Sequence, residues 1–185
     1  PGVATATCGP GVTQLASALV TASRAESPLV AFVGESPTND DEYVQRFDQG
    51  RFAAACETGF VRLATPDGTD DAVRKAFYLA KLESRPIMLS APMDIQQMNF
   101  EDDDEPYKPS ATLYSPGVAH PDAKALARAA DIIAGSKRPV IIVGRGAQWS
   151  GAGEAVLKLG DRIGALIATT LMVKTFLNES EFHAG

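Results

Sequence analysis

The chain has 185 residues, of which 45% are hydrophobic, enough for the core of one large domain or two small ones. Its formal net charge is −6, which argues against nucleic acid as the main partner, because phosphate binding needs clustered Lys and Arg. Cys8 and Cys56 stand alone, without His or Cys at metal-ligand spacing, so we expect a reduced, cytoplasmic protein without a metal centre of its own. No apolar run reaches the length of a membrane span, so we expect no membrane partner.

The first part of the chain alternates short apolar runs with helical patterns. A strand-like run ends in the turn Gly9-Pro10-Gly11, and a helix with an apolar stripe follows and ends before Pro28. The capping residues 39–42 predict a helix that continues to about Ala55. We expect strands at 3–7, 29–33, 60–64 and 86–91, with a further helix at 70–80. This alternation with short loops predicts a parallel sheet with helices on both faces.

The alternation of strands and helices stops at residues 95–121, which are polar, acidic and rich in proline, as in an interdomain connection. Its acidic run at 101–105 favours a solvated loop, with a cation site as the minor alternative. The alternation then resumes with a helix at 122–134, a strand at 139–143, a helix at 154–163 and a strand at 166–170.

The fold class is therefore α/β, with two Rossmann-like units joined by a linker rich in proline and acidic residues. Both units are expected to be incomplete in this chain. The first turn stands almost at residue 1, and the second unit has only two clear strands.

Three positions could carry chemistry, each with a structural alternative. Glycines in Gly9-Pro10-Gly11 permit close backbone approach before a helix N-terminus, but the same pattern serves a tight turn without a ligand. Gly144-Arg145-Gly146 after a strand is half of a nucleotide-binding fingerprint and lacks the third glycine. Glu35 follows a strand end, where ligands meet parallel sheets, and is either a catalytic acid or a solvated loop residue.

Several segments together are more specific than any one of them. The string from Cys8 to Gln14 resembles the Ser-Gly-Pro-Gly-(Ala/Val)-Thr-Asn turn of thiamine-diphosphate-dependent enzymes, and more narrowly of the acetolactate synthase and 2-oxo acid decarboxylase group. Further segments match this group in chain order: 28–35, Phe47-Asp48-Gln49 against a Phe-Gln-Glu segment, 85–96, 136–147, and 168–172 with Lys174. The resemblance covers nearly the whole chain.

The resemblance implies a domain plan. Residues 1–94 would belong to a pyrimidine-binding domain, 95–121 to a linker and 122–185 to a central domain. In this family the cofactor lies between two subunits, which implies a homodimer or homotetramer. The glutamate that activates thiamine diphosphate would precede Pro1, and the magnesium-binding diphosphate domain would follow Gly185. We therefore expect no catalytic residue and no metal ligand in this chain, and no activity from it alone.

The resemblance also assigns cofactor-binding residues position by position. Gly9, Pro10 and Gly11 would lie near the pyrimidine ring. Asp48 replaces a family glutamine that reaches cofactor and substrate, a departure for which Gln49 or Gln45 could substitute. Arg85 matches an arginine that contacts flavin, and a second group of residues matches the central nucleotide pocket, where relatives hold FAD, another nucleotide such as ADP, or nothing. That group consists of Gly144, Gly146, Thr170, Leu171 and Met172.

Two functions follow as hypotheses. The first is part of a lyase or transferase that uses thiamine diphosphate and Mg²⁺ to cleave or form a C–C bond next to the carbonyl of a 2-oxo acid or related acyl donor. The second, motivated by Asp48, is a non-catalytic relative that holds a nucleotide in its central domain.

Overall fold

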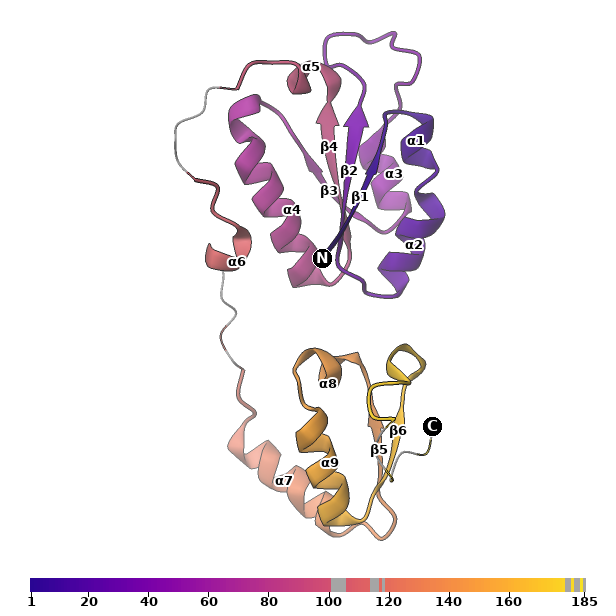
Figure 1. The fold of residues 1–185 in the computed structure, drawn as a ribbon, viewed down its shortest axis with the longest axis vertical. Coiled ribbons are helices and arrows are strands. Elements are labelled where there is room, and N and C mark those ends of the chain that lie inside the picture. Colours follow the sequence, from indigo (N-terminus) through magenta and orange to yellow (C-terminus); the bar gives the residue numbers. More distant parts are fainter. Residues whose placement is uncertain (101–105, 114–116, 118, 179–180, 182–183, 185) are drawn as a thin grey trace. The chain divides into compact units, whose positions relative to one another are not determined.

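The computed structural model describes residues 1–100, 106–113, 117, 119–178, 181 and 184 (Figure 1). The acidic run at 101–105, expected as a loop or cation site, lies outside the described residues. The chain forms two compact units, residues 1–116 and 117–185. Within the described part, no helix combines the length and the apolar character needed to cross a bilayer.

The first unit is built on a four-stranded parallel sheet in the order β1-β2-β4-β3. The strands are β1 (Gly2–Ala6), β2 (Leu29–Glu35), β4 (Pro86–Pro92) and β3 (Gly59–Arg62). All seven residues of β4 are buried, as expected for a central strand covered on both faces. The predicted α/β class with a parallel sheet is confirmed.

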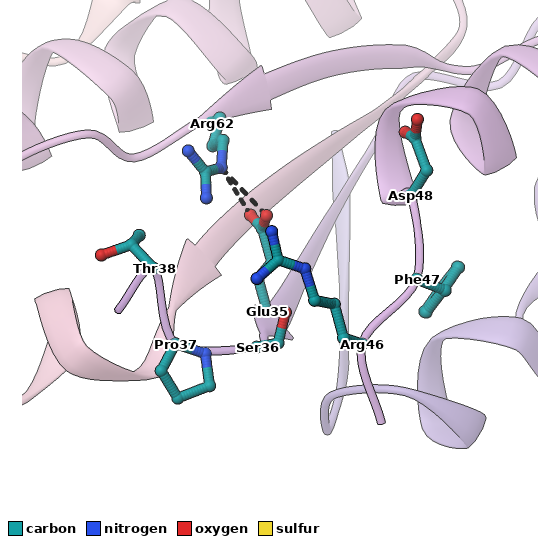
Figure 2. A pocket seen from close by; sticks show the side chains of 8 residues that line it. All are labelled: Glu35, Ser36, Pro37, Thr38, Arg46, Phe47, Asp48 and Arg62. Atoms are coloured by element: carbon teal, nitrogen blue, oxygen red, sulfur yellow. Dashed lines mark hydrogen bonds and ion pairs between the residues drawn. The ribbon is translucent and has the colours of Figure 1, made fainter. Parts of the chain in front are cut away.

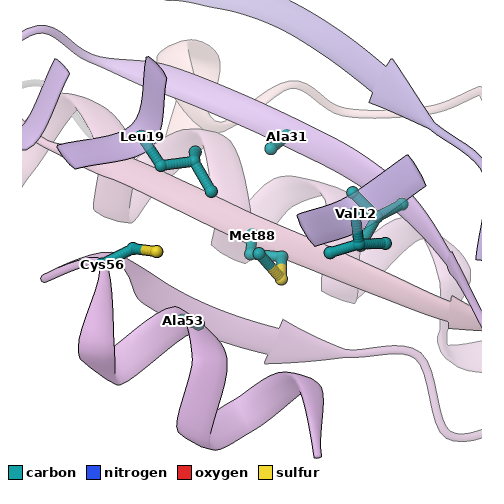
Figure 3. Packing of buried hydrophobic residues seen from close by; sticks show 7 residues of the cluster. Val12, Leu19, Ala31, Ala53, Cys56 and Met88 are labelled. Carbon is teal, nitrogen blue, oxygen red and sulfur yellow. The ribbon is translucent and has the colours of Figure 1, made fainter. Parts of the chain in front are cut away.

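Helices cover both faces of this sheet (Figure 1). One face carries α1 (Pro10–Thr13), α2 (Ala16–Arg24) and α3 (Gln49–Ala55), and the other carries α4 (Thr69–Glu83), which follows the short 3₁₀ helix η1 (Pro66–Gly68). Alternate residues of β2 face opposite cores: Ala31 and Val33 pack with Leu19 and Met88, whereas Val30 packs under α4 (Figure 3). This period of two follows from strand geometry.

The predicted helix at 39–55 is wrong in its first half. Residues 36–48 form a loop, and α3 begins only at Gln49. Asp40 is the physical reason, because its carboxylate accepts from the backbone N–H of Glu42 at 3.1 Å, a local bond that competes with helix formation. The true cap is Asp48, whose Oδ1 accepts from the Arg51 N–H at 2.8 Å.

Part of the segment expected as linker packs on the first unit. After α5 (Met93–Gln96), α6 (Ser110–Leu113) lies beside α4 (Figure 1). Arg74 on α4 donates from Nε to the carbonyl of Lys108 at 2.8 Å and lies 5.6 Å from the ring of Tyr107. These contacts hold residues 107–108 against α4.

The second unit contains a parallel pair of strands, β5 (Val140–Val143) and β6 (Leu166–Thr169). Its helices are α7 (Ala123–Ala134), α8 (Arg145–Trp149) and α9 (Gly153–Ile163), with the 3₁₀ helix η2 (Leu171–Val173) after β6. A small core of Val143, Ile167 and Leu177 lies on one face of the pair. The predicted start of α7 is confirmed, since Asp122 Oδ1 accepts from the Ala125 N–H at 2.9 Å.

The Gly9-Pro10-Gly11 turn depends on both of its glycines. Gly9 has φ +70° and ψ −120°, a conformation that side chains disfavour, and a Cβ there would lie 2.6 Å from Cβ of Gln45. A Cβ on Gly11 would lie 2.8 Å from Cγ2 of Thr7. The turn is therefore shaped by close packing against Gln45 and Thr7, and Pro10 begins α1 where its missing N–H has no cost.

We predict that Gly9→Ala lowers the free energy of unfolding by about 1–3 kcal/mol, because alanine must adopt a strained backbone conformation and displace Gln45. Urea denaturation followed by circular dichroism measures this. Gly2→Ala is the control, since its Cβ would meet Leu29 at an ordinary 3.5 Å. Equal stability of the two variants would contradict the role given to the turn.

Candidate functional site

The carboxyl ends of β2 and β3 border a pocket with a cavity volume of about 480 Å³. In open parallel sheets this edge is where ligands bind. The pocket is lined by Glu35 and Arg62 at the strand ends and by loop residues that follow β2 or precede α3 (Figure 2): Ser36, Pro37, Thr38, Arg46, Phe47 and Asp48.

Glu35 is the central acid of the pocket. Its carboxylate accepts from Arg62 Nε at 3.0 and 2.8 Å and from the Ser90 hydroxyl at 2.7 Å, and its side chain is 15% exposed. The hydrogen bond to Glu35 is the main cause that raises the pKa of Arg62, so the guanidinium keeps its charge. Glu35 is thus not a solvated loop acid but a fixed carboxylate within a polar network.

Gln49 belongs to the same network. Its Nε2 donates to the carbonyl of Gly34 at 2.8 Å, and its Oε1 lies 2.9 Å from the Ser90 hydroxyl. The side chain is buried, and both ends of its amide are used within the protein. Gln49 therefore ties α3 to the ends of β2 and β4 and does not present its amide to the pocket.

Asp48 is the neighbour that does line the pocket. It caps α3, pairs with Arg51 across 3.3 Å, and its side chain is 58% exposed. Gln45, the other candidate in this segment, accepts from the Tyr43 hydroxyl at 3.4 Å and packs against Gly9. Of the three residues considered for the family's glutamine position, the structure places Asp48 in the pocket lining.

The Gly9 turn lies at the same sheet edge. The ideal Cβ position of Gly34 is 3.1 Å from the backbone N of Cys8, so the turn and the end of β2 are close. Burial, and secondarily the charge of Glu35, raises the pKa of the Cys8 thiol; burial also raises that of Cys56. Both thiols are held in the unreactive protonated form.

The rim of the pocket is fastened at Thr38. Its backbone N–H donates to Asp94 Oδ1 at 3.0 Å, and its hydroxyl donates to Asp94 Oδ2. The hydroxyl bond is the main cause that lowers the pKa of Asp94 below its ordinary value of 3.8. The loop after β2 is thereby held to α5.

Arg85 lies at the opposite end of the sheet, where the parallel strands begin. It directly precedes β4 and pairs with Glu83, whereas Glu35 and Arg62 stand at the ends of their strands. The structure therefore does not bring Arg85 together with the pocket or with the Gly9 turn.

The remaining predicted residues lie in the second unit, at the carboxyl ends of β5 and β6. Gly144 caps α8, and the backbone N–H of Thr170 donates to the carbonyl of Val143 at 2.9 Å, which brings the two strand ends together. A Cβ on Gly146 would meet nothing within 4 Å. Leu171 and Met172 in η2 are 82% and 57% exposed.

Sequence reasoning missed Arg62 and Ser90. Each stands at or near the end of a strand that the sequence did predict, so a polar residue in an apolar strand was the available signal. Among the described residues no group of three or more His, Cys, Asp or Glu could hold a metal ion.

Both units thus combine parallel strands with polar groups and glycine turns at the strand ends, which defines an α/β protein of the open parallel-sheet class. Comparison with known proteins is more specific. Residues 1–55 match the thiamine pyrophosphate enzyme N-terminal TPP binding domain, and residues 126–184 match the thiamine pyrophosphate enzyme central domain. The chain belongs to the thiamine pyrophosphate enzyme family.

Curated relatives match along nearly the whole chain. A probable acetolactate synthase large subunit of Methanococcus aeolicus is 31% identical over 97% of this chain and 31% of its own length. That of Methanocaldococcus jannaschii is 34% identical over 94% of this chain and 30% of its own length. A probable 2-ketoarginine decarboxylase, AruI, of Pseudomonas aeruginosa is 30% identical over the full chain and 33% of its own length. The chain therefore spans less than half of each of these relatives.

We predict that Ser90→Ala lowers the free energy of unfolding by about 1–3 kcal/mol, because Glu35 and buried Gln49 Oε1 lose the one hydroxyl proton that lies within hydrogen-bond distance of both. Urea denaturation measures the loss. Ser27→Ala is the control, since the Ser27 hydroxyl makes a local bond at 3.5 Å to the Ala25 carbonyl. A change within 0.5 kcal/mol for both variants, roughly the scatter of surface substitutions, would refute the network's contribution.

We predict that the Thr38 amide signal changes as acid protonates Asp94. The folded-state pKa is depressed, so the stabilisation from this contact is present at neutral pH and is lost as the pH falls through that pKa, below about pH 4. An NMR titration of the Thr38 amide measures it. Asp94→Asn should remove this pH-dependent change of the Thr38 amide signal. Asp71→Asn, which changes an exposed acid on α4, should leave the change in place. A pH-dependent change that remains in Asp94→Asn would contradict the role given to Asp94.

Proposed function

We propose that the chain is part of a thiamine-diphosphate-dependent enzyme of the acetolactate synthase type. It would act as a lyase or transferase on the C–C bond next to the carbonyl of a 2-oxo acid or related acyl donor. The observation that carries this is the first unit's sheet edge, where the Gly9 turn, Glu35 and Asp48 lie within the stretch matched to the TPP binding domain. The relatives named as acetolactate synthases and as a 2-ketoarginine decarboxylase support the reaction class.

The residues at this edge fit the pyrimidine half of the cofactor. The Gly9 turn lies at the same sheet edge as the pocket, and the exposed Asp48 supplies a carboxylate to the pocket lining. When bound, thiamine diphosphate supplies an electron sink for the carbanion formed at the carbonyl carbon. The role of this chain's residues is to position the ring and to exclude water, with Gln49 holding α3 in place.

Magnesium does not fit the described residues, because no cluster of ligands is present among them. We therefore assign no step of this chain to Mg²⁺. A diphosphate-binding domain contributed outside the matched N-terminal and central domains would hold the metal.

We further propose the domain plan of residues 1–94 as pyrimidine-binding domain, 95–121 as connection and 122–185 as central domain, in a cytoplasmic homodimer or homotetramer. The family models support the two outer assignments by their descriptions. In the central domain, the open edge at Gly144, Gly146 and Thr170 would accept a nucleotide such as FAD or ADP.

A second candidate function is a non-catalytic relative that only binds a nucleotide. One observation favours it: Asp48 stands where the resemblance expects glutamine, and the nearby Gln49 is occupied inside the protein and does not replace it. Nucleotide binding without cofactor-dependent turnover would distinguish this candidate from the enzyme.

We predict cofactor-dependent release of CO₂ from a 2-oxo acid by the protein in the length that its gene encodes, with thiamine diphosphate and Mg²⁺ present. The 185-residue chain alone should show no turnover, because its matches cover an N-terminal and a central domain only. Coupled detection of CO₂ measures both, with an acetolactate synthase large subunit as positive control.

A matched variant sharpens this assay. Asp48→Asn keeps an equally good helix cap and removes the charge. If Asp48 contacts cofactor or substrate, kcat/KM should fall by about tenfold or more, since hydrogen bonds to charged groups contribute about 1.5–3 kcal/mol. If the folded protein, in the length that its gene encodes, neither binds thiamine diphosphate nor turns over any 2-oxo acid, the proposed function is contradicted.

A further inference from the structure

The acids and bases of the pocket in the first unit differ in how far their hydrogen-bonding capacity is used. Glu35 accepts two bonds from Arg62 and one from Ser90. Asp48 accepts from the Arg51 N–H and pairs with the Arg51 side chain. Thr38, also in the lining, gives its N–H and its hydroxyl to Asp94. Glu35, Asp48 and Thr38 are therefore already hydrogen-bonded within the protein.

The two arginines have donors to spare. Among the hydrogen bonds of the described residues, Arg62 donates through Nε, and no bond joins its terminal nitrogens to Glu35 (Figure 2). Arg46 uses one terminal nitrogen, which donates to the Asp40 carbonyl at 3.1 Å and pairs with Asp41. Both side chains are 44% exposed. The unused hydrogen-bonding groups of the two arginines are therefore N–H donors, which favour a ligand with acceptor oxygens.

Arg62 is also fixed in orientation before a ligand arrives. Its partner Glu35 is itself held by Ser90, which lies fully buried in the central strand, and Ser90 is next to buried Gln49. A guanidinium held through Nε presents its two terminal nitrogens side by side, the geometry that binds a carboxylate through two parallel hydrogen bonds. Little side-chain entropy remains to be lost on binding.

We propose that this pocket is a carboxylate-binding subsite, in which the terminal nitrogens of Arg62 bind the carboxylate of a small 2-oxo acid and Arg46 adds a second donor from the loop after β2. The identity of the ligand as a 2-oxo acid rests on the proposed function. The binding of a carboxylate does not, because it needs no catalysis.

The test is an NMR titration of the 185-residue chain with pyruvate, with pyruvamide as its neutral analogue and with inorganic phosphate. We expect saturable pyruvate binding that shifts signals of Glu35, Thr38 and Arg62, and no binding of pyruvamide. Phosphate that competes with pyruvate and shows the same dependence on Arg62 supports the subsite. Phosphate binding without pyruvate binding overturns the carboxylate assignment.

Three variants locate the binding. Arg62→Lys keeps the positive charge beside Glu35 but loses the fork, and the Kd for pyruvate should rise about tenfold. Arg46→Ala changes an exposed loop side chain and should raise the Kd about threefold. Arg24→Ala removes the same charge at the C-terminal end of α2, where Arg24 pairs with Glu57. Arg24 does not line the pocket, so this variant should leave the Kd for pyruvate unchanged. Equal effects of all three variants, or no effect of any, would overturn the subsite.

Two results separate this inference from the proposed function. If Arg62→Lys fails to fold, as judged from its amide spectrum, the comparison of Arg46→Ala with Arg24→Ala still shows whether pyruvate binding depends on an arginine of the pocket. Pyruvate binding that depends on Arg46 or Arg62, in a protein of encoded length without cofactor-dependent turnover, would support the subsite and contradict the proposed function. Turnover of pyruvate without such binding would overturn the subsite alone.

Discussion

The Ser90 hydroxyl lies 2.7 Å from Glu35 Oε2 and 2.9 Å from Gln49 Oε1, and it has one proton for these two acceptors. Ser90 is on the central strand, with β2 on one side and β3 on the other, so this contact joins the elements that border the pocket. Through Glu35 it sets the direction of Arg62, and through Gln49 it holds the start of α3. The arrangement of the pocket depends on this buried hydroxyl.

Such a polar network is stable only because the sheet around it is covered on both faces. Met88 and Leu89 precede Ser90 on β4 and point into opposite cores, one under α1, α2 and α3 and the other under α4. Low polarity in these cores makes an unpaired polar atom costly, and within the described residues every buried side-chain N or O atom has a partner. Apolar packing therefore forces the polar side chains at the strand ends to pair with one another.

The fold could be predicted from the sequence because its signals are local. Apolar runs, glycine turns and the spacing of helical stripes identified every strand of the first sheet to within two residues. The start of α3 could not be predicted in this way. Asp40 and Asp48 are both good capping residues, and only the bond of Asp40 to the Glu42 N–H, together with the packing of Gln45 against Gly9, decides that the helix begins later.

The sequence by itself determined the α/β class and, through ordered motifs, the resemblance to thiamine-diphosphate enzymes, because both are recorded in residue types and spacing along the chain. The tertiary structure alone decided which polar residues meet. Arg62 and Ser90 are 28 positions apart yet stand side by side in register, whereas adjacent Asp48 and Gln49 point to different surroundings, one into the pocket lining and one into the core. Strand pairing and the direction of each side chain on its element cause both outcomes, and neither can be read from a motif.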